Sequence, residues 1–126
     1  MAKNLAPPPL KSSLSSKGNV TYLDDPSKFD KSKRSVILVG ASWCHFSRLG
    51  AGKLDEACKD IKNGKCYLAD VTDPACEKAI EKIGISSDRY PDHFVWNPKS
   101  KAFSEIVGMR DVPSLKKELT SKGFKF

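Results

Sequence analysis

Long hydrophobic runs are absent from this sequence of 126 residues. No stretch approaches the roughly 18 consecutive apolar residues of a transmembrane helix, and residues 1–16 lack the apolar centre of a secretory signal. We therefore expect a cytoplasmic protein without membrane contact. Hydrophobic residues make up 39% and charged residues 29% of the chain, which is typical of a soluble globular protein, and the length suits one domain with its own core.

Cysteine is scarce and widely spaced. No two cysteines lie two to four residues apart, and only His45 and His93 would add nitrogen ligands, so we expect no zinc site. An oxidising compartment would allow two disulfides, but nothing else in the sequence indicates a small disulfide-stapled scaffold. We interpret one cysteine as reactive and three as structural. The four cysteines are Cys44, Cys58, Cys66 and Cys76.

The sequence also lacks nucleic-acid-binding motifs and a nucleotide fingerprint. Its formal net charge of +7 favours encounter with acidic partners. The lysines are scattered, however, and form no basic helix face with aromatic residues between them. We therefore expect no nucleic-acid partner and no bound nicotinamide.

The first 18 residues differ in composition from the rest of the chain. Pro7, Pro8 and Pro9 are followed by a Ser/Lys-rich run without hydrophobic periodicity, which is typical of a flexible segment. We predict a flexible arm over residues 1–18 and a folded domain over residues 19–126. The three prolines also fit a docking motif, but a solvated tail is the simpler interpretation.

The folded domain alternates strand and helix patterns. Residues 36–39 (Val-Ile-Leu-Val) are apolar at every position, as in a strand covered on both faces. The expected order is a strand at 20–22, a turn or short helix after 25–26, a strand at 36–39, a helix at 47–63, a strand at 66–71, a helix at 74–83, a hairpin of strands at 93–96 and 102–107, and a helix from 111. This β-α-β-α-β-α-β-β-α order predicts an α/β sandwich with right-handed crossovers.

Cys44 follows the apolar strand at the point where the next helix begins. Its sulfur is therefore expected to face unpaired backbone N–H groups and the positive end of the helix dipole. This environment favours the thiolate, which is the nucleophile in disulfide exchange. Cys44 is accordingly the candidate reactive residue.

The segment Ala-Ser-Trp-Cys-His-Phe-Ser at residues 41–47 resembles the active-site segment of the thioredoxin family, whose pattern is Trp-Cys-x-x-Cys. Tyr90-Pro91 is similar to the cis-proline loop of that family, and Asp70 and Gly108 fall where its third strand and its post-hairpin glycine belong. The resemblance covers nearly all of the predicted domain. It implies a thioredoxin fold, with a central mixed β-sheet flanked by helices on both faces.

The resemblance assigns roles to the residues around the reactive cysteine. Cys44 would attack a protein disulfide, and Trp43 would form a wall beside it. His45 and Phe46 occupy the dipeptide that tunes the redox potential in this family, and a protonated histidine there would stabilise the thiolate further.

The resemblance also implies a substrate-binding groove. Tyr90 and Pro91 would lie beside Cys44, with the bond between them cis and the backbone of residue 90 pairing to an extended substrate segment. Gly108 would leave room for that segment.

Two positions depart from the family pattern. Ser47 stands where the family has its resolving cysteine; a hydroxyl cannot close the disulfide that releases product, so a mixed disulfide on Cys44 would persist until an outside thiol cleaves it. Leu38 stands where thioredoxins place a buried acid. Cys58 cannot replace the missing cysteine, because helix geometry puts it about 21 Å from Cys44, beyond the reach of a disulfide.

These features predict a monomeric thiol–disulfide oxidoreductase, or isomerase, that acts on protein disulfides. It would hold no bound cofactor and would depend on glutathione or on a partner reductase or oxidase. Ser47 would be either natural, giving a monothiol enzyme, or engineered, giving a trap for mixed disulfides.

Two alternatives stay open. One is a peptide-binding module that uses only the fold, and the other is a [2Fe–2S]- and glutathione-binding protein, since Cys-His-Phe-Ser at residues 44–47 is also similar to the site of monothiol glutaredoxins.

Overall fold

The computed structural model describes residues 7–15 and 18–126. Its strands are β1 (Val20–Tyr22), β2 (Ser35–Gly40), β3 (Lys65–Asp70), β4 (Asp92–Asn97) and β5 (Ala102–Val107). Its helices are α1 (His45–Cys58), α2 (Pro74–Lys82) and α3 (Val112–Ser121), and two 3-10 turns are η1 (Leu10–Ser13) and η2 (Pro26–Lys28). None of the helices that the structure describes is long and apolar enough to span a membrane.

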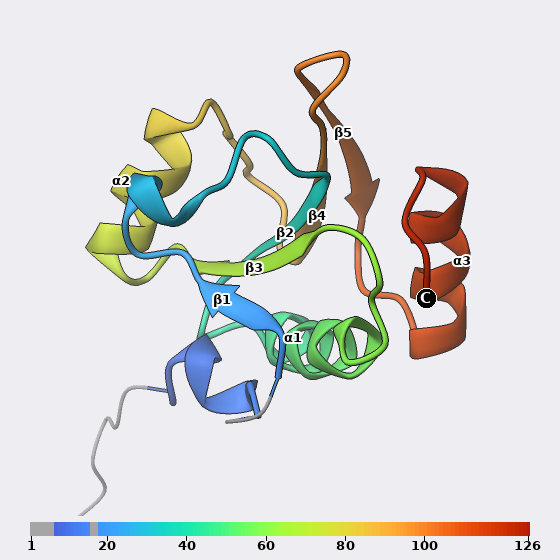
Figure 1. Cartoon of the computed structure of the whole chain (residues 1–126). Coiled ribbons are helices and arrows are strands. Elements are labelled where there is room, and N and C mark those ends of the chain that lie inside the picture. The colour runs from blue at the N-terminus through green and yellow to red at the C-terminus, as the bar shows by residue number, and fades with distance from the viewer. Residues whose placement is uncertain (1–6, 16–17) are drawn as a thin grey trace, which may run out of the picture.

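The strands form one mixed sheet in the order β1-β3-β2-β4-β5 (Figure 1). The pairs β1–β3 and β2–β3 are parallel, whereas β2–β4 and β4–β5 are antiparallel. In this register Gly40, the last residue of β2, lies opposite Asp70, the last residue of β3. The carboxyl ends of two central parallel strands therefore meet at one edge of the sheet, which is where α/β folds commonly place their functional residues.

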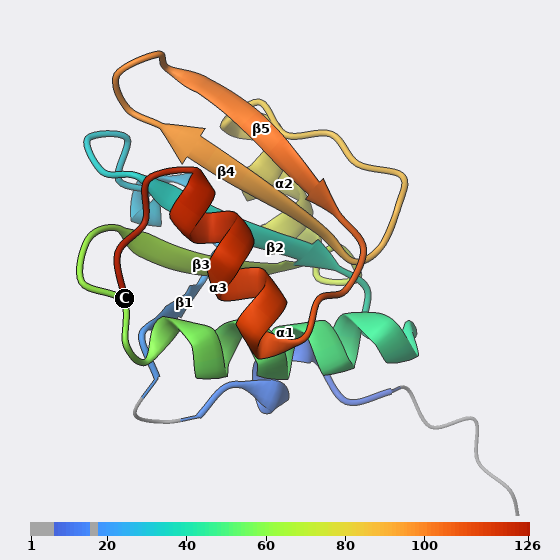
Figure 2. The same cartoon turned by 90° about the vertical axis from the view of Figure 1, so that its right-hand side faces the viewer.

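Helices cover both faces of the sheet, as predicted (Figure 2). On one face, α1 and α3 enclose a core that includes Leu38 of β2 and Leu68 of β3. On the other face, α2 packs over Ile37 and Tyr67. All six residues of β2 are buried, because successive side chains of this strand enter opposite cores. The predicted α/β architecture is confirmed.

The turn or short helix expected after residues 25–26 is the 3-10 turn η2. Asp25 caps it by accepting a hydrogen bond from the backbone N–H of Ser27 (2.9 Å), and Pro26 occupies its first position. The turn ends at Phe29, whose buried ring packs in the core beside α2. Burying Phe29 so soon after the cap leaves no length for a regular helix at this point.

The helix α1 runs from His45 to Cys58, whereas the prediction placed it at 47–63. At its carboxyl end, the side-chain amide of Asn19 donates to the carbonyl oxygens of Cys58 (2.9 Å) and Lys59 (3.4 Å). These bonds satisfy acceptors that a helix terminus leaves without intrahelical partners. A residue from before β1 therefore caps the end of α1, which local sequence patterns could not reveal.

The flexible arm predicted over residues 1–18 is wrong for residues 7–15. Leu10 in η1 is fully buried, and its N–H donates to the Asp70 carboxylate (3.1 Å). The Ser15 N–H donates to Asp55 in α1 (3.1 Å). One leucine among prolines, serines and lysines creates no periodic pattern, but burying it contributes about 2 kcal/mol. Residues 1–6 and 16–17 of the predicted arm lie outside the described residues.

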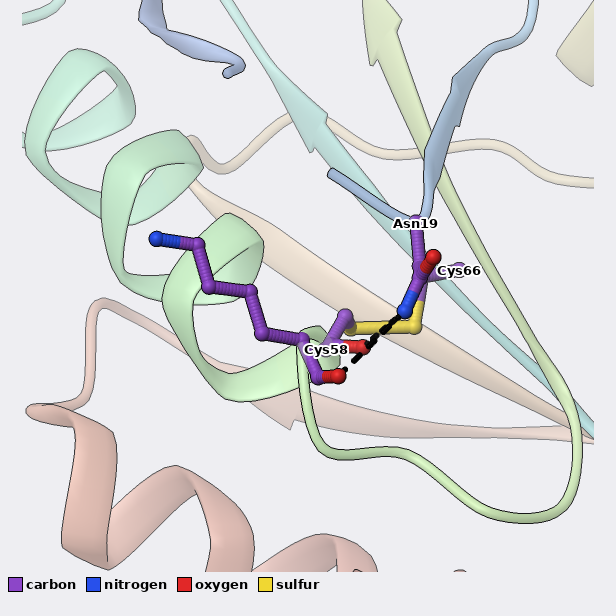
Figure 3. The surroundings of a disulfide bond; sticks show 4 residues. Asn19, Cys58 and Cys66 are labelled. Atoms are coloured by element: carbon purple, nitrogen blue, oxygen red, sulfur yellow. Dashed lines mark hydrogen bonds between the residues drawn. A yellow bond between two sulfur atoms is a disulfide. The ribbon is translucent and has the colours of Figure 1, made fainter. Parts of the chain in front are cut away.

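A disulfide joins Cys58, at the end of α1, to Cys66 in β3 (Figure 3). Their Cα atoms are 6.7 Å apart and both residues are buried. Both are structural residues, as expected, but the bond between them was not predicted. The turn after α1 brings them together across a sequence separation of 8, and that closure is not visible in the spacing alone. Cys44 and Cys76 are free.

Candidate active site

Cys44 is the N-cap residue of α1, with an extended backbone (φ −94°, ψ 117°). Its N–H donates to the Ala41 carbonyl (2.9 Å), which closes a tight turn directly after β2. Its own carbonyl accepts the first helical hydrogen bond, from the Arg48 N–H (3.1 Å). The strand end, the turn and the helix start therefore fix the backbone on both sides of the thiol, as the sequence predicted.

The pKa of the Cys44 thiol is lowered from its ordinary value. Partial burial acts to raise the pKa, but it is outweighed by hydrogen bonds from the Ser47 side chain and from the backbone of Ser47 and Phe46. The positive charge of Arg48 acts in the same direction. Since all these groups sit in the first turn of α1, the helix start supplies the stabilisation of the thiolate.

The Ser47 side chain hydrogen-bonds to the Cys44 thiol. It is fully buried, and its hydroxyl oxygen accepts a hydrogen bond from the Ala41 N–H (3.2 Å). A methyl group at Gly40 would come within 2.9 Å of the Ser47 side chain, so this packing requires glycine at the end of β2. The hydroxyl therefore fills the position beside Cys44 and holds the preceding turn.

The loop before β4 approaches Cys44 from the other side. The Tyr90–Pro91 peptide bond is cis. The Cys44 Sγ lies 3.7 Å from the Tyr90 carbonyl oxygen, and the Gly108 N–H donates to the Pro91 carbonyl (3.1 Å). Gly108 has a φ of +86°, which favours glycine. The structure thus places Tyr90 next to the thiol and links Gly108 to Pro91, the residue that follows Tyr90.

An exposed apolar surface borders Cys44. Trp43 and Phe46 are 61% and 58% exposed, although large aromatic side chains are usually buried. The Trp43 ring meets the Tyr90 ring edge to face, with centroids 6.0 Å apart. His45 is exposed and its ring lies against Phe46. Exposed apolar side chains of this size beside a thiol are typical of a site that binds another molecule.

Leu38 and His93 both lie in the core. Leu38 is fully buried among apolar side chains, so β2 supplies no acid at that position. His93 lies opposite Leu38 in β4. Burial lowers the pKa of His93 to about 4, and its Nδ1 lies 3.3 Å from the Ile106 carbonyl. His93 is therefore a neutral structural histidine.

The structure adds a buried acid that the sequence analysis missed. Asp92 follows the cis-proline directly and is 1% exposed. The Ser87 hydroxyl donates to its carboxylate (3.0 Å). Burial, together with the facing Glu105 carboxyl, raises the pKa of Asp92 to about 6. In the sequence, only its position directly after Pro91 pointed to a role for Asp92. Its proximity to Glu105 depends on the register between β4 and β5, which the sequence does not show.

A metal site does not appear among residues 7–15 and 18–126, where no three potential ligands of the types His, Cys, Asp and Glu cluster together. The groups brought together at the start of α1 are a single thiol with a lowered pKa and the exposed aromatic side chains of Trp43 and Phe46.

Comparison with known proteins gives structural relatives only. No protein-family model and no curated protein matches the chain. Thioredoxin O2 from Arabidopsis thaliana in its oxidized state is 25% identical, with a TM-score of 0.65 over 86% of this chain and 97% of that one. A poplar thioredoxin h mutant is 21% identical, with a TM-score of 0.64 and 84% of each chain covered. Human ERp44 is 18% identical, with a TM-score of 0.65 over 86% of this chain and 31% of ERp44.

Proposed function

We propose that this chain, which has the thioredoxin fold, is a thiol–disulfide oxidoreductase of the thioredoxin-like superfamily whose nucleophile is Cys44. The observation that carries the proposal is the position of this cysteine at the start of α1, where Ser47, two backbone N–H groups and Arg48 lower the pKa of its thiol. Nucleophilic cysteines in thiol–disulfide exchange need such an environment.

The first step is attack of the Cys44 thiolate on one sulfur of a protein disulfide. The bond between Cys44 and that sulfur forms as the substrate S–S bond breaks, and the electron pair leaves with the second substrate sulfur, which takes a proton from water. The substrate segment would lie along the backbone at Tyr90 and Gly108 and over the exposed Trp43 and Phe46 rings. The spacing of 3.7 Å between Sγ and the Tyr90 carbonyl supports this placement.

The second step requires an outside thiol. Ser47 has no sulfur with which to release the substrate, so glutathione or a partner thiol attacks the Cys44 sulfur and the substrate leaves as a thiol. A second outside thiol then regenerates the Cys44 thiolate, and the two outside thiols end as one disulfide for each substrate disulfide reduced. A natural monothiol enzyme would complete this cycle, whereas an engineered Ser47 would hold the mixed disulfide as a trap.

The proposal is tested by the alkylation rate of each cysteine from pH 4 to 9, mapped by peptide mass spectrometry on the folded protein. We expect Cys44 to react with a midpoint below about 7.5. Cys76 is the internal control, because it is buried and burial raises the pKa of its thiol. If Cys44 titrates at the ordinary thiol value of about 8.5 or reacts no faster than Cys76, the proposal is wrong.

The mixed disulfide on Cys44, which only an outside thiol can release, provides a second test. Incubation with oxidised glutathione should add one glutathione to Cys44, and the adduct should persist after the excess is removed and disappear when reduced glutathione is added. A Ser47→Cys variant should lose the adduct without added thiol. The Cys44→Ser variant, in which no adduct should form, controls for reaction elsewhere.

The exposed Trp43 and Phe46 surface also favours a second candidate, a peptide-binding module without redox turnover. A Cys44→Ala variant distinguishes the two. Binding of a cysteine-free peptide that survives this substitution, combined with an unreactive thiol in the wild-type protein, would select the module.

A further inference from the structure

Asp70 is a buried acid whose carboxylate binds two separate parts of the chain. It ends β3 opposite Gly40, from which the turn to Cys44 starts, and it is 1% exposed. One carboxylate oxygen accepts from the Leu10 N–H (3.1 Å). The other accepts from the N–H (3.0 Å) and the hydroxyl (2.6 Å) of Thr72. A buried carboxylate is costly unless donors satisfy it, so this site fixes all three donors in place.

Thr72 is also hydrogen-bonded to Ser42, and the donor of this second bond can be identified. The Thr72 and Ser42 hydroxyl oxygens are 2.9 Å apart, and each hydroxyl has a single proton. Since Thr72 gives its proton to Asp70, Ser42 must donate to Thr72. The negative charge of Asp70 therefore orients two hydroxyls in sequence and holds Ser42, two residues before Cys44.

Ser42 in turn holds the cation next to the nucleophile. Its backbone carbonyl accepts a hydrogen bond from the Arg48 guanidinium (2.6 Å). This contact keeps the charge of Arg48 over the start of α1, where it favours the Cys44 thiolate. Without a fixed Ser42 carbonyl, the long arginine side chain would be free to turn toward solvent.

We propose that Asp70 is a positioning residue for the Cys44 nucleophile, acting through Thr72 and Ser42 on Arg48. The proposal rests on the function proposed above and adds residues that the resemblance did not assign to the site. Leu10 completes the arrangement, because it occupies the remaining carboxylate oxygen and packs within reach of Gly40. The segment 7–15, expected to be free, therefore belongs to the support of the active site.

Other titratable groups also surround these residues. Lys11, Asp73 and Cys76 lie around Asp70. His45 follows Cys44 directly, and Arg48 faces it from α1. A shift in the pH dependence of Cys44 alkylation could therefore arise from any of these groups. Several variants must be compared to show that it arises from Arg48.

The test is the midpoint pH of Cys44 alkylation in Thr72→Val, which removes the hydroxyl from an exposed residue and leaves the core intact. We expect the midpoint to rise by about half a unit, with a matching fall in the rate of mixed-disulfide formation at pH 6. Thr72→Ser, which keeps the hydroxyl, should retain the wild-type midpoint. Asp70→Asn offers one acceptor oxygen in place of two, so the Leu10 N–H or Thr72 loses its partner. It also removes a negative charge, which by itself lowers the pKa of a nearby thiol, so only a rise of the midpoint supports the inference at this position.

Two further variants show whether the effect passes through Arg48. Tyr22→Phe removes a comparable side-chain hydrogen bond to Asp73 (2.7 Å) that is not connected to Ser42, and it should leave the midpoint unchanged. In an Arg48→Met background, Thr72→Val should have little additional effect, since coupled residues are not additive. The inference is overturned if folded Thr72→Val keeps the wild-type midpoint, or if its full shift persists in Arg48→Met. An ordinary wild-type Cys44 midpoint would instead refute the proposed function, and this inference with it.

Discussion

The hydroxyl of Ser47 connects the Cys44 thiol to the turn before it. It accepts from the Ala41 N–H at 3.2 Å and hydrogen-bonds to the Cys44 sulfur, where it lowers the pKa of the thiol. The residue that takes the place of a resolving cysteine in the proposed cycle thus also lowers the pKa of the proposed nucleophile. A serine at this position is chemically suited to a monothiol site, because it stabilises the thiolate without competing for the substrate.

Replacing Ser47 by alanine should therefore raise the Cys44 pKa. The lost hydrogen bond favours the thiolate over the thiol, so its removal shifts the titration toward higher pH. The buried Ala41 N–H also loses its acceptor, which should lower the free energy of unfolding by about 1–3 kcal/mol. Cys44 alkylation against pH and urea unfolding check the two effects, and a variant with an unchanged alkylation midpoint would contradict the first.

Leu10→Ala should destabilise the protein by about 2–5 kcal/mol, the usual cost of emptying a buried leucine site. Leu10 is fully buried, whereas Leu49 is 40% exposed, so Leu49→Ala is a matched control and should change stability by about 0.5 kcal/mol or less. Urea unfolding of both variants measures the difference. Equal effects would mean that the segment 7–15 is not packed on the domain in solution.

The sequence was sufficient for features that depend on local patterns. The apolar run of β2 predicted a strand buried on both faces, and Cys44 was placed correctly at the start of α1. Leu10 could not be predicted in the core, because a single buried leucine leaves no periodic signal. Asp70 and Asp92 were missed as active-site neighbours for a related reason: their partners, Thr72 with Leu10 and Glu105, are set by tertiary structure and strand register.

The disulfide between Cys58 and Cys66 predicts a definite thiol count. The denatured, unreduced protein should contain two reactive thiols, those of Cys44 and Cys76, and four after reduction. Because the closed loop is short, reduction should cost about 2–3 kcal/mol of stability in the chain-entropy model. Thiol titration and urea unfolding with and without reductant test this, with Cys44→Ser as the control that retains the bond.

Four reactive thiols before reduction would contradict the pairing. A persistent bond would favour an oxidising compartment, since thiols in the cytosol are kept reduced. The redox state of Cys58 and Cys66 in intact cells, trapped by rapid alkylation, therefore also tests the cytoplasmic location expected from the sequence.

Asp92 should make the stability depend on pH. Its pKa is raised from 3.8 to about 6 in the folded protein, so between these values the folded state keeps a proton that the unfolded state has lost. The contribution of Asp92 is therefore fully present below about pH 4 and is lost as the pH rises through about 6. His93 acts in the opposite direction, because its pKa of about 4 means that its contribution is lost as the pH falls below about 6.5.

Comparing Asp92→Asn with the wild-type protein separates the two groups, since both keep His93. The free energy of unfolding of the variant relative to wild type should increase between pH 4 and pH 6 by up to about 2 kcal/mol and then level off. Asp88→Asn removes a charge from a side chain that is 98% exposed and serves as the control. If the free energies of unfolding of the variant and the wild-type protein differ by the same amount throughout this pH range, burial and Glu105 do not raise the pKa of Asp92.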